Sequence, residues 1–247
     1  MNREVIFNSI DNFIGKKTST GVIDEVFFKE DNPLGLKFLG MGNSAIVLSK
    51  DNYAIKIYKR KNASYKALIV NGKPYSTNKW KKEFTNNLEH KILSDLDKVE
   101  GIPKLYKKKN NYIIMEKIEG LTIEELLEDS RIAIRCDKVD FYNSYLKYFN
   151  LDSIYRQFNR LALEIALKGY RIDDTHVNNI IINEDGKVNI VDVGGFKKDK
   201  HSRIDNLIEL NEEALMYGFL VKKYLNSIDS IKSAFLKKLE KKEGIVK

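Results

Sequence analysis

The chain has 247 residues, 43% of them hydrophobic, which suits one large or two small globular domains. Cys136 is its only cysteine, so an intramolecular disulfide and a cysteine-rich zinc site are both excluded. No apolar run is long enough to cross a bilayer and the first residues lack the apolar core of a signal peptide, so we expect neither feature.

The excess of positive charge does not predict a nucleic-acid partner. The chain carries 43 lysines and arginines against 35 acidic residues, a net charge of +8. Such a balance can favour anionic partners, but these lysines are scattered along the whole sequence. One cluster, residues 197–200, is kept as a place where a substrate would enter.

The first chemical signal is a glycine run followed by a short strand. Gly40 and Gly42 open a run that ends at Val47, and glycines allow a backbone to approach phosphates closely. Nine residues after Val47, the predicted strand 53–56 ends on Lys56. Taken singly, the run predicts a plain β-turn and the lysine a solvated side chain.

An amphipathic helix is predicted over residues 79–96, with an expected buried stripe at helical spacing. A lysine aimed into a cleft needs a carboxylate partner, and this helix offers two. They are Glu89 and Glu83, while an ordinary surface glutamate is the third interpretation. The stripe consists of Phe84, Leu88, Ile92 and Leu96.

The chain continues with two strands and then mainly helices. The strands are predicted at 101–106 and 112–120. Thr122, followed three residues later by Glu125, forms the capping box of the next helix. Further helices are expected at 139–149, 152–168, 203–224 and 228–241.

Residues 170–194 carry polar side chains at a spacing that suits phosphoryl transfer. Asp174 lies five residues before Asn179, and Asn179 lies thirteen before Asp192. A hydrophobic hairpin, 180–182 with 188–191, fills the gap and would hold the polar groups along one edge of a cleft. Phosphoryl transfer depends mainly on metal clamping and on positioning the attacking hydroxyl.

In their order along the chain, these motifs resemble the ATP site of protein kinases. The glycine run looks like the Gly-rich loop, although Ala45 stands at its third glycine position. Tyr53-Ala-Ile-Lys56 and Glu89-His-Lys-Ile-Leu93 look like the kinase lysine strand and αC helix. Asp192-Val-Gly194 stands where kinases have Asp-Phe-Gly.

The same resemblance assigns roles in catalysis. Lys56 would hold the α and β phosphates and pair with Glu89, and Asp174 would orient the attacking hydroxyl. Asn179 and Asp192 would bind Mg²⁺ or Mn²⁺. Asp173 with Asn178 has the same internal spacing, but the thirteen-residue step to Asp192 matches the kinase pattern only from Asn179.

The resemblance also implies how the nucleotide is held. Met115 would lie at the back of the adenine pocket, and backbone groups of residues 116–118 would hydrogen-bond the base. The full set of expected nucleotide contacts is Gly40, Gly42, Val47, Ala54, Lys56, Met115, Glu116, Ile118 and Ile181.

Two departures from the kinase pattern limit the interpretation. Ile172-Asp173-Asp174 replaces His-Arg-Asp, so activation by a loop phosphate is not expected. His176 follows, and Asp174-x-His176-x-x-Asn179 looks like aminoglycoside and choline phosphotransferases. Its imidazole would contact the γ phosphate or hold the loop by a hydrogen bond. Only 53 residues follow Gly194, which resembles minimal bacterial kinases, including effector, RIO-like and lipopolysaccharide-sugar kinases.

The expected fold is therefore α+β and bilobal, kinase-like, with a β-rich N-lobe, one αC helix and a truncated helical C-lobe. The expected parts are an extension (1–35), an N-lobe (36–117) and a C-lobe (118–247). The predicted activity is transfer of the γ phosphate of MgATP to a protein Ser or Thr. The alternatives are a small-molecule alcohol kinase and a nucleotide-binding pseudokinase. The expected location is cytoplasmic, or a host cytosol for a secreted effector.

Overall fold

The computed structural model describes most of the chain. The described residues are 3–18, 34–42, 44–58, 68–70, 73–75, 87–136, 140, 145–147, 149–172, 176–198 and 205–242. The chain divides into two compact units, which we call unit 1 (1–91 with 104–117) and unit 2 (92–103 with 118–247). The domain limits expected from the sequence stay a prediction.

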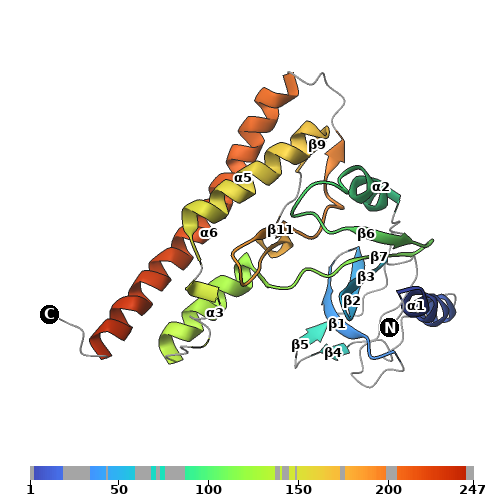
Figure 1. Cartoon of the computed structure of the whole chain (residues 1–247), viewed down its shortest axis with the longest axis horizontal. Helices are drawn as coiled ribbons and strands as arrows, with labels where there is room; N and C mark the ends of the chain where they lie inside the picture. The colour runs from blue at the N-terminus through green and yellow to red at the C-terminus, as the bar shows by residue number, and fades with distance from the viewer. Residues whose placement is uncertain are drawn as a thin grey trace. The chain divides into compact units, whose positions relative to one another are not determined.

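Unit 1 is built on a five-stranded antiparallel sheet in the order β1-β2-β3-β7-β6 (Figure 1). A two-residue turn joins β2 to β3, and its first residue, Asp51, takes a left-handed φ of 50°. Hairpin turns of this length favour such a conformation. The strands are β1 (Lys37–Met41), β2 (Ala45–Lys50), β3 (Tyr53–Tyr58), β6 (Leu105–Lys108) and β7 (Tyr112–Glu116), with β4 (Leu68–Val70) and β5 (Lys73–Tyr75) as a separate pair.

Helix α1 (Arg3–Thr18) supplies one side of the unit 1 core. Ile6, Phe7, Ile10 and Ile14 recur at helical spacing and are all buried. They belong to one hydrophobic cluster with side chains from the sheet. The other buried members of this cluster are Leu36, Ile46, Leu48, Ile55, Ile57, Tyr112 and Ile114. The N-terminal helix is thus part of the core of unit 1.

A polar contact also holds α1 on the sheet. Lys107 donates a hydrogen bond of 2.6 Å to the Asp11 carboxylate, and the Tyr112 hydroxyl donates a second one. Burial raises the pKa of Asp11, but these two hydrogen bonds outweigh it and the pKa lies below its usual value. Burial and the neighbouring Asp11 raise the pKa of Tyr112.

The described part of the predicted αC helix is α2 (Asn87–Asp95), and its buried face differs from the predicted stripe. Leu88, expected in the stripe, is 54% exposed, whereas Glu89 is 3% exposed. Ile92 and Leu96 are buried as predicted. The difference lies at the start of the described helix, where Glu89 is buried in place of Leu88 and faces Lys56, as described below. Phe84 and Glu83 lie outside the described residues.

The described residues of unit 2 are mainly helical. Figure 1 shows α5 beside the long helix α6, which also contacts α3. The helices are α3 (Ile123–Cys136), α5 (Leu151–Leu167), α6 (Asp205–Lys242) and the 3-10 turn η3 (Val177–Asn179). The short strands are β8 (Leu121–Thr122), β9 (Tyr170–Arg171), β10 (Ile180–Ile182), β11 (Val188–Ile190) and β12 (Lys197–Lys198).

Three local predictions for unit 2 are confirmed. The capping box is present, because Thr122 Oγ1 accepts a hydrogen bond from the Glu125 N–H while Glu125 accepts one from the Thr122 N–H. The hydrophobic hairpin is the antiparallel pair β10–β11, and β10 also pairs with β8. The predicted helix 152–168 is α5, which begins after Asn150, whose side chain accepts from the Ser153 N–H.

The prediction of two helices after residue 203 is wrong, because α6 is one continuous helix of 38 residues. No proline interrupts it. At the position of the expected break and just after it, Ser227 and Ser230 donate to the carbonyls of Lys223 and Asn226 within the helix. The predicted helix 139–149 lies largely outside the described residues.

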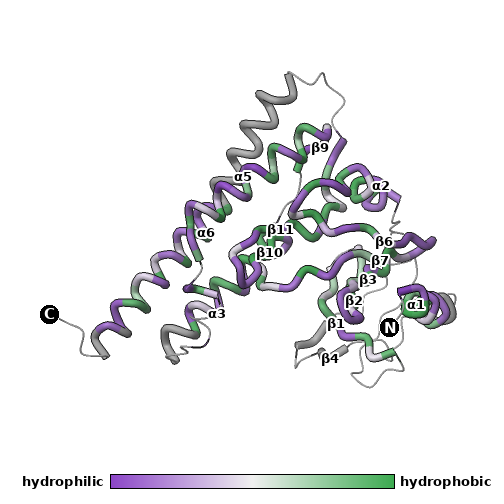
Figure 2. The backbone as a smooth tube through the Cα atoms, viewed as in Figure 1, coloured by the Kyte–Doolittle hydropathy of each residue, from purple (hydrophilic) through white to green (hydrophobic). Residues whose placement is uncertain are grey.

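These elements confirm the α+β class, with a β-rich unit and a mainly helical one. Figure 2 shows hydrophilic and hydrophobic residues interleaved along α5 and along the coloured part of α6. Consistent with this pattern, no helix within the described residues has the length and apolar content of a membrane span.

Candidate functional site

The register of the unit 1 sheet gathers four of the nine predicted nucleotide contacts on one face. Val47 stands opposite Lys56 across the β2–β3 pair, and Ala54 stands opposite Met115 across the β3–β7 pair. Side chains alternate between the faces of a strand, so these four residues share a face. Their neighbours Ile46, Ile55 and Ile114 belong to the α1 cluster on the other face.

The glycine run forms the turn between β1 and β2. The Gly42 N–H donates to the Ala45 carbonyl at 3.0 Å, and Gly40 stands opposite Val47. Nothing lies within 4 Å of where a Cβ would stand on Gly40 or Gly42, and neither has a left-handed φ. The fold itself therefore does not require glycine at these two positions. Open space beside both is compatible with close approach by a ligand.

At the centre of this face, Lys56 and Glu89 form a buried ion pair. The Lys56 ammonium lies 2.8 Å from both carboxylate oxygens of Glu89. The two side chains are only 5% and 3% exposed. Glu89 is in the first turn of α2, where the helix dipole favours a negative charge. The structure thus pairs Lys56 with the glutamate favoured from the sequence.

Tyr58 is a third member of this group, and the sequence analysis missed it. Its hydroxyl donates a hydrogen bond of 2.5 Å to Glu89 Oε2, and the residue is 4% exposed. The sequence does contain a signal for this residue. Side chains two positions apart on a strand share a face, so Tyr58 lies on the same face as Lys56. The buried carboxylate therefore receives two donors from β3.

The predicted hinge region has part of its backbone already engaged. The Glu116 N–H donates to the Lys104 carbonyl at 2.8 Å, and the Lys117 N–H donates to the Asn52 carbonyl at 3.0 Å. Met115 is buried, whereas Glu116 and Ile118 are half-buried. An adenine base would therefore have to use backbone groups of 116–118 other than those two N–H donors.

In unit 2, the two predicted metal ligands are brought together by backbone hydrogen bonds. The Val191 N–H donates to the Asn179 carbonyl at 2.9 Å, which extends the β10–β11 pairing beyond Ile180 and Ile190. Asp192 follows directly and accepts the Gly194 N–H at 3.0 Å. Asn179 and Asp192 thus lie at the same end of the hairpin, and both are half-buried. Ile181, at the middle of β10, is also half-buried.

This pair has the chemistry of a magnesium site that is completed by a substrate. Mg²⁺ in nucleotide enzymes is commonly held by one or two protein oxygens together with phosphates and water. Asn179 and Asp192 offer an amide and a carboxylate oxygen. Within the described residues, no group of three or more His, Cys, Asp or Glu side chains could hold a metal alone.

The predicted catalytic Asp174 lies outside the described residues, as does Asp173, so the choice between the two registers stays a prediction. On one side of them, the Tyr170 hydroxyl donates to Asp95, and burial and this contact raise the pKa of Tyr170. On the other side, His176 is exposed and precedes η3, which its side chain does not cap by a hydrogen bond.

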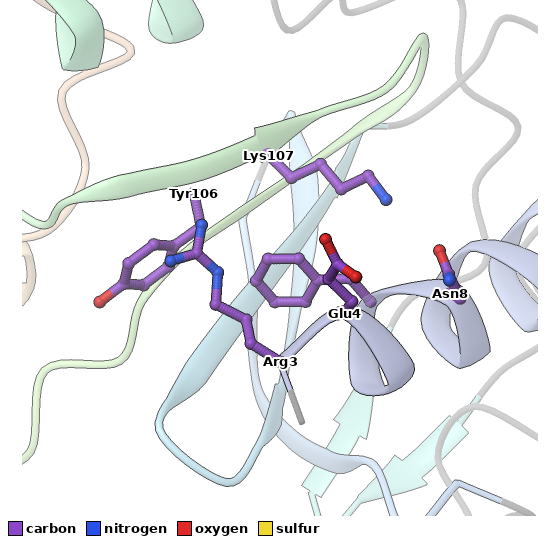
Figure 3. A pocket seen from close by; sticks show the side chains of 6 residues that line it. Arg3, Glu4, Asn8, Tyr106 and Lys107 are labelled. Atoms are coloured by element: carbon purple, nitrogen blue, oxygen red, sulfur yellow. The ribbon is translucent and has the colours of Figure 1, made fainter. Parts of the chain in front are cut away.

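A surface pocket of unit 1 lies on the other side of the sheet from Lys56. Figure 3 shows its lining between α1 and β6, where the Arg3 guanidinium lies 5.0 Å from the Tyr106 ring centroid and 5.4 Å from that of Phe7. None of the predicted site residues lines it. The lining residues are Arg3, Glu4, Phe7, Asn8, Tyr106 and Lys107.

Comparison with known proteins finds structural similarity to solved structures but no match of sequence. No family model matches the chain, and no curated protein does. The chain is similar to a crystal structure of the Rio2 kinase from Chaetomium thermophilum in a complex with ADP/Mg²⁺ and phosphoaspartate, with 13% identity and a TM-score of 0.43. The similarity covers 72% of this chain and 52% of the Rio2 chain, so the chain spans about half the length of that protein. A shared function does not follow from a similarity at this level.

Proposed function

We propose that the chain is a phosphotransferase that uses MgATP and passes the γ phosphate to a hydroxyl, most simply that of a protein Ser or Thr. The observation that carries the proposal is the buried Lys56–Glu89 pair. It lies on the sheet face that also bears Val47, Ala54 and Met115.

The ion pair supports nucleotide binding because burying two charges is costly. Removing both charges from water costs several kcal/mol per ion, and their attraction does not by itself stabilise a fold. A buried pair of this kind is therefore better explained by a function than by stability. An ammonium has three donors, so Lys56 can contact phosphate oxygens while Glu89 still holds it.

The groups assigned to unit 2 supply the remaining chemistry. Asn179 and Asp192 would hold Mg²⁺, which neutralises charge on the phosphates during transfer. Asp174 would orient the acceptor hydroxyl. These three roles are proposals that rest on the spacing in the sequence and, for Asn179 and Asp192, on their position at one end of the β10–β11 hairpin.

His176 favours a second candidate, a kinase that acts on a small alcohol such as a sugar or aminoglycoside. The pattern Asp174-x-His176-x-x-Asn179 resembles that of such enzymes. An exposed imidazole remains available to a phosphate or an acceptor.

The proposal is tested with γ-labelled ATP, Mg²⁺ and the purified chain. We expect label on the chain itself or on a generic acceptor protein, and no label with Asp174→Ala. The variant should still bind MgATP, because Asp174 is assigned to the acceptor. Turnover only on addition of a small alcohol would select the second candidate. Binding of MgATP without transfer to any acceptor would contradict the phosphotransferase function.

A further inference from the structure

We propose that Tyr58 is a positioning residue for this reaction, because its hydroxyl fixes the Glu89 carboxylate that in turn orients Lys56. The inference rests on the proposed function and deepens it. Tyr58 touches neither the nucleotide nor the acceptor in this account. It acts through Glu89.

The three side chains form one buried group inside unit 1. Lys56 Nζ lies 2.8 Å from Glu89 Oε1 and 2.8 Å from Oε2, and the Tyr58 hydroxyl lies 2.5 Å from Oε2. The ammonium also lies 5.8 Å from the centroid of the Tyr58 ring. All three residues are at most 4% exposed. The ring and the hydroxyl of one tyrosine thus contact both members of the ion pair.

Tyr58 is held firmly enough to act as a fixed donor. Its backbone N–H donates to the Asn111 carbonyl at 2.8 Å, which ties the end of β3 to the turn before β7. Its cross-strand neighbour is Ala45, which is 2% exposed. A small side chain at position 45 leaves space beside the tyrosine ring. Ala45, which stands at the third glycine position, is thus the cross-strand neighbour of Tyr58.

A second donor becomes important when phosphates bind. Lys56 must then share its three N–H donors between Glu89 and the phosphate oxygens. A buried carboxylate that loses a donor pays a large desolvation cost. The Tyr58 hydroxyl is a neutral donor that phosphates do not attract electrostatically, so it keeps Glu89 in place during this exchange.

The first test compares two tyrosines that each donate to a carboxylate in unit 1. Tyr58→Phe removes the bond to Glu89, and the matched control Tyr112→Phe removes the bond to Asp11 on the α1 face. We expect Tyr58→Phe to lower kcat/KM for ATP about tenfold. Tyr112→Phe should change it less than about twofold. Equal effects of the two variants would overturn the inference.

A double-mutant cycle separates positioning from a merely structural role. In a Glu89→Ala background, Tyr58→Phe should have little further effect on kcat/KM, because the carboxylate that its hydroxyl holds is absent. The same tenfold loss in both backgrounds would overturn the inference. Far-UV circular dichroism and the melting temperature of each variant establish that it is folded. If Tyr58→Phe does not fold, Tyr58→His, which keeps a ring with a donor, should retain activity that Tyr58→Leu lacks.

The outcome for Tyr58 is distinguishable from the outcome for the proposed function. A wild-type chain that transfers phosphate, together with a Tyr58→Phe variant of equal kcat/KM, contradicts the role of Tyr58 alone. A wild-type chain that neither binds MgATP nor transfers phosphate contradicts the proposed function, and the role of Tyr58 fails with it.

Discussion

Ile55 and Lys56 are consecutive residues of β3, yet they serve opposite faces of one sheet. Ile55 is fully buried in the cluster formed with α1, whereas Lys56 pairs with Glu89 on the other face. The face packed on α1 stabilises the strand, and the other face presents the charge. If the proposed function is right, substitutions on the two faces will change stability and nucleotide binding separately.

The first prediction concerns the α1 face. Ile10→Ala should lower the free energy of unfolding by about 3 kcal/mol, because it opens a cavity at a residue that is 1% exposed. Thermal or urea unfolding measures this change. Val5→Ala is the control, since Val5 is 52% exposed and should change stability by less than about 0.5 kcal/mol. A similar small effect of both variants would show that α1 is not part of the core.

The second prediction concerns the glycine turn. Gly40→Ala should leave stability almost unchanged, because its φ is ordinary and nothing lies within 4 Å of the added Cβ. The added methyl group should nevertheless raise the Kd for MgATP about tenfold, by keeping the phosphates away from the backbone. Calorimetric titration measures the affinity. An unaltered Kd would remove the phosphate-binding role from this turn.

Gly120→Ala is the control for the measurements of stability and MgATP affinity on Gly40→Ala. Gly120 has a φ of 141°, and an added Cβ would lie 2.5 Å from the Ile182 carbonyl oxygen. We expect a loss of more than about 2 kcal/mol in stability from this strain. If Gly40→Ala were as destabilising as Gly120→Ala, its effect on ATP binding could not be assigned to the ligand.

The third prediction is a pH dependence that originates at Asp11. Its pKa is lowered in the folded chain by hydrogen bonds from Lys107 and Tyr112. Its stabilising contribution is therefore complete above the unfolded pKa of about 3.9 and is lost as the pH falls through the lower folded value. Asp11→Asn should reduce stability by about 2 kcal/mol at neutral pH. The difference from the wild type should shrink towards pH 2. A difference that stays constant from pH 7 to pH 2 would contradict this assignment.

The fourth prediction concerns the metal. Asp192→Ala should weaken the binding of ATP in the presence of Mg²⁺ and leave its binding in EDTA almost unchanged, because the carboxylate is assigned to the cation. The matched control is Asp185→Ala, which removes an exposed carboxylate from the turn of the same hairpin. Titrations with and without Mg²⁺ test this. An equal loss of affinity in EDTA would argue against a metal ligand.

The sequence predicted what depends on short-range pattern. The β10–β11 hairpin, the Thr122–Glu125 capping box and α5 follow from strand alternation, capping chemistry and helical spacing. The buried face of α2 was mispredicted at its first turn. Hydropathy placed Leu88 inside, whereas the structure buries Glu89, which pairs with Lys56. Local periodicity cannot predict an ion pair between two residues that lie 33 positions apart in the sequence.

Two other features could not be predicted for related reasons. A break was expected at residues 225–227, where α6 continues as one helix that no proline interrupts. The contribution of α1 to the core depends on which sheet face it meets. The sequence analysis treated residues 1–35 as an extension, and the helical spacing of Ile6, Phe7, Ile10 and Ile14 does not say which sheet face the helix meets.

The measurement that tests the central claim most directly is the effect of MgATP on the unfolding of the wild-type chain and of Lys56→Met. A ligand at about 100 times its Kd stabilises a folded protein by about 2.7 kcal/mol. We expect the wild type to gain this stability and the folded variant to gain almost none. No stabilisation of the wild type at millimolar MgATP, or equal stabilisation of both chains, would contradict the ATP site built around Lys56 and Glu89.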